Sequence, residues 1–294
     1  MNRFSIKDIE NLTGIKAHTL RIWEQRHGII IPKRTDTNIR YYDGEDLKLA
    51  LKVALLNQHG HKISRIQKMS DDQVNALLRE TTDVEFQFEY LLNNLLEATI
   101  DMNMEQFEAL INKYIKKFGI EQAVEQLIFS FLEKIGIMWM TNRIFPAQEH
   151  LVSNIIMRKI LLAIEKLPTK TDFAQPKFLL FLPEGEIHEM GLLYMQYLLL
   201  KHNNTVVYLG ANTPTNDVAF VCNATQPDYL YTHITSASND FDIDKYMLKL
   251  SEIHAGKKVF VSGTMLSKTT ISNRYDNIDL LNSLDDVKNM LHSI

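Results

Sequence analysis

One histidine of the chain stands where its chemistry could serve a ligand. The stretch "LPEGEIHEMG" puts His188 in a short polar turn directly after an apolar run. A neutral imidazole is a good ligand for a transition metal, and Glu186 could hold its second nitrogen and raise its basicity. Gly191 has no side chain, so a bulky ligand could approach the backbone there.

A purely structural role for this histidine stays open on these residues alone. A single histidine near a helix start often serves only as a cap, and a zinc site would need two or three further ligands that are absent at local spacing. If His188 binds a metal, the ligand must therefore bring that metal with it.

The region around His188 alternates strands with helices. Strand candidates are "KFLLFL", "TVVYLG", "DYLYTH" and "KVFVSG", starting at residues 177, 205, 228 and 257, with a short last one near Ile278. Helical patterns fill the gaps, which predicts a parallel sheet covered on both faces, of Rossmann or flavodoxin-like type. The turn that holds His188 then lies at the carboxyl edge of the strands, where open α/β folds bind ligands.

A second group of polar and aromatic residues lies in "WMTNRIFPAQEH". Trp139 ends one predicted helix, and Glu149 and His150 stand in the first turn of the next. A core tryptophan followed by an ordinary helix start at Pro146 would explain the same pattern.

The segment that contains this group is rich in Leu, Ile, Phe and Met at helical spacing and poor in Gly and Pro. It predicts a four-helix bundle, and "PTKTDFAQP" after it is typical of a linker. The expected helices cover residues 85–100, 104–118, 120–140 and 146–166.

The first segment predicts a helix-turn-helix with a wing. Ser5 can cap a helix that Gly14 ends, and a second helix follows over about residues 16–26. "IIIPKRTDTNIRYY" predicts a hairpin whose tip is bracketed by Arg34 and Arg40. Helices over about 44–59 and 61–69, and a further helix from Asp71, pack behind it. Such a unit could bind DNA, with the second helix facing the bases and the wing arginines meeting phosphates. An ordinary amphipathic surface helix would show part of the same pattern.

Charge and composition narrow the class of protein. Residues 1–79 contain 14 Lys+Arg and 9 Asp+Glu, a net charge of +5. The whole chain of 294 residues has a net charge of −4, so the remaining 215 residues have a net charge of −9. No apolar run approaches the roughly 18 residues of a membrane span, and the single cysteine, Cys222, fits a buried position in a reducing compartment. We expect a soluble cytoplasmic protein.

The stretch "TLRIWEQRHGIIIPKRTDTNIRYYDGEDL" resembles the signature of MerR-family transcription regulators, with Ile22 and Trp23 in place of the usual tyrosine pair. The resemblance implies binding of a homodimer to inverted half-sites in double-stranded DNA, and RNA polymerase as a further partner. By position it assigns to DNA binding the recognition-helix and wing residues His18, Thr19, Arg21, Arg34, Arg40 and Tyr42.

The stretch "EIHEMG" resembles the Asp-x-His-x-x-Gly signature of cobalamin-binding domains, with Glu186 at the aspartate position as in regulators of the CarH/LitR type. The resemblance implies that His188 is the lower ligand to cobalt in a base-off cobalamin. It also places Ser236 and Gly263 beside the nucleotide tail. Trp-x9-Glu-His resembles the cap motif of the same regulators, so Trp139, Glu149 and His150 would cover the upper face of adenosylcobalamin.

One position departs from the light-sensing members of that group. A histidine that captures cobalt after photolysis follows their tryptophan, whereas this chain has Met140. A thioether is a poorer ligand for oxidised cobalt than imidazole is. Light therefore remains one hypothesis for the signal, and sensing of the cofactor itself is the other.

These observations predict a multidomain α and α/β protein. A MerR-type winged helix-turn-helix (1–79) would precede a four-helix-bundle cobalamin cap (84–167) and a Rossmann-like cobalamin-binding domain (177–294). We expect a regulator without catalytic activity. The resemblance to these regulators implies that adenosylcobalamin in the dark favours a homotetramer, built from dimers, that occludes a promoter. The alternatives are a MerR-type regulator that senses another corrinoid or a protein partner, and a corrinoid methyl carrier, against which the helix-turn-helix argues.

Overall fold

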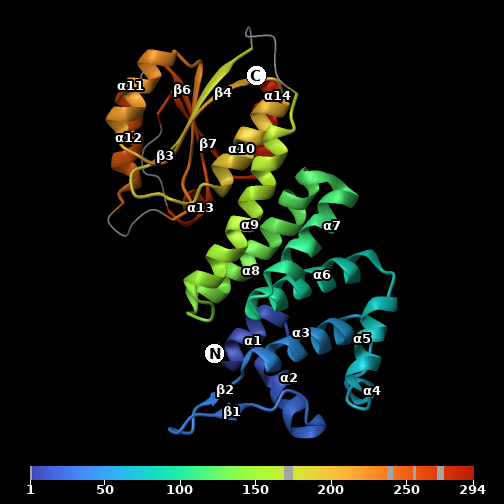
Figure 1. Cartoon of the computed structure of the whole chain (residues 1–294). Coiled ribbons are helices and arrows are strands. Elements are labelled where there is room, and N and C mark those ends of the chain that lie inside the picture. Colours follow the sequence, from blue (N-terminus) through green and yellow to red (C-terminus); the bar gives the residue numbers. More distant parts are fainter. Residues whose placement is uncertain (1, 169–174, 237–240, 254–255, 270–274) are drawn as a thin grey trace. The chain divides into compact units, whose positions relative to one another are not determined.

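The computed structural model describes residues 2–168, 175–236, 241–253, 256–269 and 275–294 (Figure 1). The chain divides into two compact units, Met1–Ile156 and Met157–Ile294, each described by itself below. Most of the predicted linker, residues 169–174, lies outside the described residues.

The N-terminal unit begins with the predicted helix-turn-helix. Helix α1 (Ile6–Thr13) starts in a capping box formed by Ser5 and Asp8, and ends at Gly14 in the left-handed conformation, with φ 73°. Helix α2 (Ala17–Ile22) then continues as one stretch of wider, π-type turns, η1 (Trp23–His27). The predicted second helix is confirmed, with this widened second half that the sequence pattern does not reveal.

The predicted wing is a short antiparallel hairpin. Strands β1 (Lys33–Arg34) and β2 (Arg40–Tyr41) pair with Arg34 opposite Arg40. Phe4 and Tyr42 exchange both backbone hydrogen bonds, at 2.8 Å each. These bonds tie the base of the wing to the residues just before α1.

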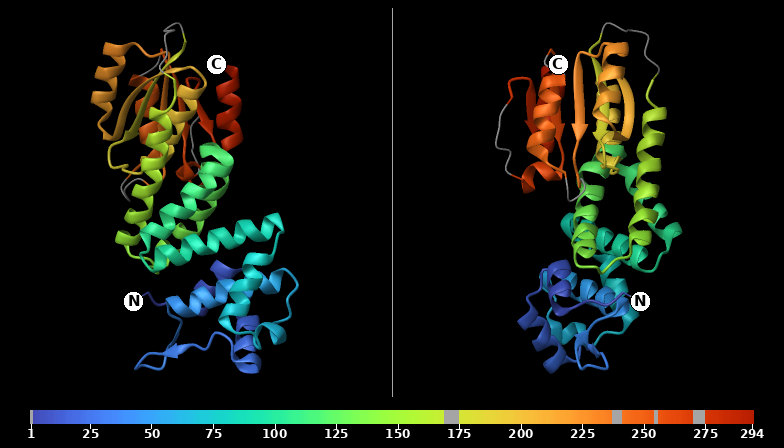
Figure 2. Two further views of the ribbon diagram at one scale, coloured as in Figure 1. Left: turned by 45° about the vertical axis from the view of Figure 1, so that its right-hand side comes forward. Right: turned by 90° about the vertical axis from the view of Figure 1, so that its left-hand side faces the viewer.

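Seven further α-helices and one π-type stretch complete the part of the chain that runs through the bundle, and the two views of Figure 2 follow them from blue to green. Gly119, with φ 84°, separates the second and third helices of the predicted bundle, because its backbone conformation is one that side chains disfavour. The predicted helix over 61–69 is shorter, at Ile63–Ile66. The segments are α3 (Gly44–Gln58), α4 (Ile63–Ile66), α5 (Asp71–Glu80), α6 (Val84–Ile100), α7 (Met104–Gln122), η2 (Ala123–Ile128), α8 (Phe129–Met140) and α9 (Pro146–Glu165).

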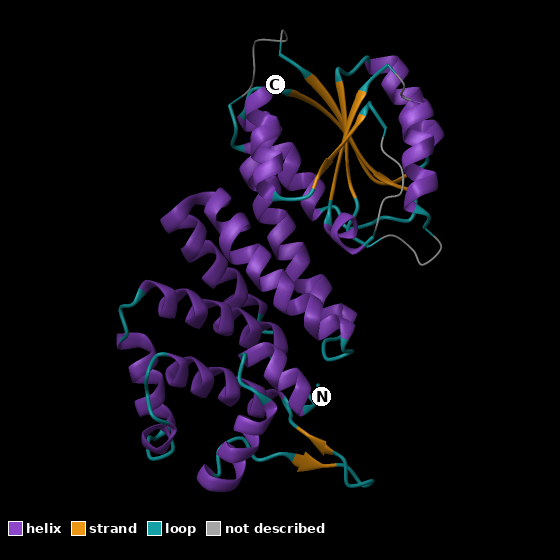
Figure 3. Cartoon of the chain, turned by 180° about the vertical axis from the view of Figure 1, so that it is seen from behind, coloured by secondary structure: helices purple, strands orange, loops and turns teal. Residues whose placement is uncertain are grey.

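The C-terminal unit is the predicted parallel sheet. Its strand order is β4-β3-β5-β6-β7, and every neighbouring pair is parallel. Figure 3 shows helices on both faces of the sheet. The strands are β3 (Lys177–Pro183), β4 (Thr205–Thr213), β5 (Tyr229–His233), β6 (Lys258–Ser262) and β7 (Ile278–Leu281), and the helices are α10 (Met190–Lys201), α11 (Thr215–Thr225), α12 (Ile243–Ile253), α13 (Thr264–Lys268) and α14 (Leu284–Ser293).

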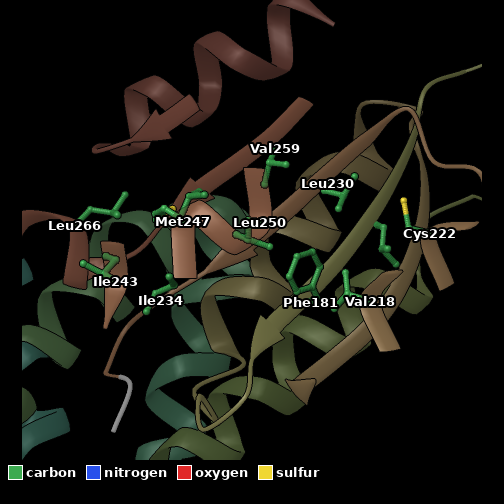
Figure 4. Close-up of a cluster of buried hydrophobic side chains, with 12 residues drawn as sticks. Phe181, Val218, Cys222, Leu230, Ile234, Ile243, Met247, Leu250, Val259 and Leu266 are labelled. Atoms are coloured by element: carbon green, nitrogen blue, oxygen red, sulfur yellow. The ribbon is translucent and has the colours of Figure 1, made fainter. Parts of the chain in front are cut away.

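A core between the sheet and two of these helices holds the unit together. Phe181 and Leu230 from the strands meet Cys222 of α11 and Met247 of α12, all nearly inaccessible to solvent (Figure 4). Cys222 therefore occupies a buried apolar position, as predicted.

The strand order creates one topological switch point. After β3 the chain crosses to β4 at one edge, and after β4 it returns to β5 on the other side of β3. The loops that leave the carboxyl ends of β3 and β5 therefore diverge, which is the arrangement that leaves a ligand-binding crevice in open α/β folds.

Candidate functional site

The two diverging loops are joined by one buried carboxylate. Glu186, in the loop after β3, is completely shielded from solvent. Its Oε2 accepts the backbone N–H groups of Thr235 (2.8 Å) and Ser236 (2.7 Å) in the loop after β5. Its Oε1 accepts the N–H of His188 (2.9 Å) and lies 2.6 Å from His188 Nδ1.

These four contacts keep Glu186 ionised. Burial alone would raise the pKa of its carboxyl, but the hydrogen bonds from His188, Ser236 and Thr235 outweigh burial and lower the pKa to about 2. An ionised carboxylate can only accept hydrogen bonds, so Nδ1 of His188 must carry the proton. In the neutral imidazole the lone pair is then on Nε2, the form that ligates metal ions.

The loop before His188 is anchored to the neighbouring strand. Asn212, at the end of β4, accepts the N–H of Gly185 through its side chain (2.9 Å) and donates its own N–H to the carbonyl of Glu186 (3.0 Å). The His188 side chain is 49% exposed. Glu186 thus fixes the orientation of an imidazole that is about half exposed.

Gly191 lies where a second imidazole approaches the backbone. A Cβ at this position in the first turn of α10 would stand 2.4 Å from Nε2 of His233, closer than atoms can approach. His233 ends β5, and its Nδ1 is 2.7 Å from the hydroxyl of Ser262, which also lies 2.5 Å from the hydroxyl of Tyr231. Within the described residues, the group that requires a glycine at 191 is therefore the His233 ring.

Position 263 also requires a glycine. Its φ is 116°, and a Cβ there would stand 2.1 Å from the carbonyl oxygen of Ile234. The loop after β6 consequently lies against the loop after β5, next to Ser236. The sequence-predicted residues Glu186, Ser236 and Gly263 thus gather at one sheet edge.

Sequence reasoning missed the row behind these residues. His233 and Ser262 end the adjacent parallel strands β5 and β6, and Tyr231 stands two residues before His233 on β5. Burial lowers the pKa of His233 to about 4, while the nearby carboxylate of Glu186 opposes that shift. Polar residues at the ends of apolar strands were the available signal, because such ends meet at the carboxyl edge of the sheet.

The predicted cap residues lie at one end of the helical bundle. Trp139 stands in the last turn of α8, and its side chain is 53% exposed, which is unusual for a tryptophan in a helical core. Glu149 and His150, in the first turns of α9, are bonded to each other, with Oε2 and Nδ1 2.8 Å apart. Ser153 donates to the other oxygen of Glu149. The exposed Trp139 favours a binding role over a core role.

The predicted DNA-contacting residues lie on one helix and the wing. His18 and Arg21 of α2 are exposed, and Thr19 beside them is half-buried. Arg34 and Arg40 are also exposed.

Two of these positions have partners inside the unit. Arg34 donates to the Asn38 side chain (2.8 Å), and Arg40 lies 3.6 Å from Glu24. Tyr42 is only 2% exposed, so it supports the wing from within.

Neither a metal-binding cluster nor a membrane-spanning helix is found among the described residues. No group of three or more His, Cys, Asp or Glu side chains in the described part of the chain could hold a metal ion. No helix in the same part is long and apolar enough to cross a bilayer.

Comparison with known proteins finds two family models. Residues 4–73 match the MerR HTH family regulatory protein model, and residues 91–163 match the B12 binding domain model.

Two curated relatives match most of this chain. The HTH-type transcriptional repressor CarH of Myxococcus xanthus is 24% identical over 267 residues, which cover 88% of each chain. The HTH-type transcriptional repressor CarA of the same organism is 26% identical over 225 residues, covering 76% of this chain and 73% of that one. Among solved structures, the monomethylamine corrinoid protein of Methanosarcina barkeri superposes with a TM-score of 0.54 at 15% identity, covering 69% of this chain and 98% of that chain, which shows likeness of fold.

The contact between Gly191 and His233 predicts a specific pair of variants. Gly191→Ala should lower the free energy of unfolding by about 1–3 kcal/mol, because the new methyl overlaps the imidazole. Gly191→Ala combined with His233→Ser should recover most of that loss. Urea unfolding of the single and double variants measures both effects. Gly136→Ala is the control, since that helical glycine has open space around it; a similar loss there, or no recovery in the double variant, would contradict the contact.

The buried His233 predicts a dependence of stability on pH. Its pKa of about 4 in the folded chain lies below its ordinary 6.5, so the unfolded chain binds a proton that the folded chain does not as pH falls from 6.5 to 4. Stability should fall over that window, by up to about 3 kcal/mol from this group. Urea unfolding across the window should give a shallower decline for His233→Asn. Parallel curves for the two chains would show that His233 is not responsible.

Proposed function

We propose that this chain, a transcription regulator of the MerR family with a cobalamin-binding domain, binds adenosylcobalamin through His188 and conveys the state of that ligand to DNA. One observation carries the proposal. Nδ1 of His188 is held by the buried, ionised Glu186, which presents Nε2 as a ligand at the carboxyl edge of the sheet.

The residues of the sheet edge suit the group that the family implies. His188 would supply the lower ligand to cobalt, and Glu186 would keep the proton on Nδ1. Ser236 and Gly263 would line the nucleotide tail, and Gly191, whose backbone closely approaches His233, would bound the same space. The adenosyl form of the cofactor supplies a cobalt–carbon bond that light can break.

The helical bundle would supply contacts to the adenosyl group. The exposed indole of Trp139 offers an apolar surface to an adenosyl group, while the bonded pair Glu149 and His150 offers polar contacts. The B12-binding match over residues 91–163 covers all three residues and supports this assignment.

The basic helix-turn-helix would meet double-stranded DNA as a homodimer. Arg21, together with His18 and Thr19, would face base edges from α2, and Arg34 and Arg40 would meet phosphates from the wing. Both curated relatives are named transcriptional repressors, which supports repression without catalysis. We expect a cytoplasmic location, a homotetramer in the ligand-bound state and RNA polymerase as the machinery excluded or contacted at the promoter.

Met140 bears on which signal the regulator would read. Its thioether is 65% exposed directly after Trp139. Because a thioether is a poorer ligand for oxidised cobalt than imidazole is, Met140 would hold the metal less well than a histidine at this position would. This position favours sensing of the cofactor itself over light, although light would still cleave the bound cofactor.

The ligand assignment predicts a defined spectrum. Purified chain mixed with adenosylcobalamin in the dark should give a base-off, histidine-ligated absorbance spectrum and a larger species on sizing chromatography. His188→Ala should lose the histidine-ligated spectrum and weaken binding at least about tenfold, since one strong metal–ligand bond is removed. His61→Ala is the matched control. A wild-type spectrum in His188→Ala would refute the assignment, and illumination that bleaches the complex without changing its size would remove light from the proposal.

The wing predicts a salt-dependent loss of DNA affinity. On a duplex selected by the wild-type chain from a random library, Arg34→Ala and Arg40→Ala should each weaken binding. Each should also reduce the slope of log affinity against log salt by about 1 per lost phosphate contact in the monomer. Arg79→Ala, an exposed arginine on α5, should leave the slope unchanged. Equal slopes for all of these chains would show that the wing does not contact phosphate.

A further inference from the structure

Helix α1 is held near both of its ends by cations from one neighbouring segment. Near its start, Nε of Arg143 lies 2.6 Å from Oδ2 of Asp8. Near its end, Nζ of Lys134 donates to the carbonyl of Leu12 at 3.4 Å. Lys134 belongs to α8 and Arg143 to the loop after α8, and α1 and α8 contact each other (Figure 1). The helical bundle thus binds α1, a helix of the segment that we assign to DNA, through one ion pair and one hydrogen bond.

The grip at the start of α1 is largely withdrawn from solvent. The Asp8 side chain is 5% exposed, and the same oxygen accepts the N–H and the hydroxyl of Ser5 in the capping box. Among the described residues the buried Nε–H of Arg143 makes no hydrogen bond of normal geometry, so charge holds this pair. Removal of the arginine would leave a buried carboxylate without its counter-ion, which is costly.

A third contact comes from the first turn of α9. The buried side chain of Gln148 accepts a hydrogen bond from Asn2 (3.3 Å) and donates to the carbonyls of Thr99 (3.2 Å) and Ile100 (3.1 Å). Gln148 therefore links the residues before α1 to the end of α6. It stands next to Glu149 in the chain.

The gripping residues alternate along the chain with the residues that we assign to the ligand. Lys134 precedes Trp139 on α8, Arg143 stands between Trp139 and Glu149, and Gln148 precedes Glu149. Any displacement of the end of α8 or of its loop would move the partners of α1.

Helix α1 in turn positions the DNA-binding elements. Glu10 of α1 accepts the N–H of Ala17 at the start of α2 (3.1 Å), and Phe4 is paired with Tyr42 at the base of the wing. A shift of α1 therefore carries both the recognition helix and the wing with it.

We propose that Arg143 and Lys134 are coupling residues, through which the state of the ligand at Trp139 changes the placement of α1 and hence DNA affinity within one chain. This inference rests on the proposed function, since it assigns its regulation. A ligand shifts such an equilibrium only if it favours one arrangement of α8 and its loop over another. The coupling acts in addition to any change of assembly.

A first test needs no ligand. Hydrogen exchange of the full-length chain should show the amides of Ile6–Thr13 exchanging about tenfold faster in Arg143→Met than in wild type, with normal protection in Arg143→Lys, which keeps the charge. Asp8→Asn should resemble Arg143→Met, because the amide oxygen can still cap while the charge is lost. Unchanged protection of α1 in Arg143→Met would overturn the inference.

A second test measures the coupling itself. Affinity for the selected duplex, with and without adenosylcobalamin in the dark, gives a coupling factor, expected to be at least about fivefold in wild type. Arg143→Met and Lys134→Met should each bring this factor close to unity while the cobalamin spectrum stays that of wild type. Arg79→Met is the matched control and should keep the wild-type factor.

The outcomes separate the two proposals. A wild-type coupling factor in both variants overturns the coupling role of these residues and leaves the ligand assignment intact. A wild-type chain that binds cobalamin with a factor of unity overturns coupling within the chain. A wild-type chain that shows no histidine-ligated spectrum refutes the proposed function instead.

Discussion

The carboxylate of Glu186 is the interaction on which the candidate site depends. It joins the loops after β3 and β5 at the switch point of the sheet, and it fixes the tautomer of His188. Burial of an ionised carboxylate is tolerated only because four hydrogen bonds satisfy it. Since the same group orientates the imidazole and joins the two loops, loss of its charge would disturb both the fold at this edge and the cobalt ligation that we propose for His188.

In the N-terminal unit, the carboxylate of Asp8 also serves two purposes. Asp8 caps α1 and at the same time neutralises Arg143 from the bundle. Capping is a local interaction, whereas the ion pair reaches across the unit. One carboxylate therefore connects the start of the helix-turn-helix to the loop between Trp139 and Glu149. The proposed regulation within one chain depends on a physical connection of this kind, because the residues that we assign to DNA and those that we assign to the ligand lie in different segments of the chain.

Periodicity and turn residues were sufficient to predict the helices, the wing and all five strands, because each depends mainly on nearby residues. The sequence also revealed the pair Glu186 and His188, since these residues are only two positions apart in the chain. The sequence did not reveal three other features: the contact of Gly191 with His233, the ion pair of Arg143 with Asp8, and the π-type turns after Ile22. The first two join residues distant in sequence, and their partners are ordinary polar residues whose pairing only the folded chain reveals.

The most direct test of the central claim is electron paramagnetic resonance of the chain loaded with cobalamin in the cobalt(II) state, prepared with and without nitrogen-15 histidine. Coordination by His188 predicts that the nitrogen splitting of the cobalt signal changes from three lines to two on labelling, and that this change disappears in His188→Ala. A splitting that is insensitive to the label would mean that the cofactor keeps its own base as lower ligand, and it would contradict the account.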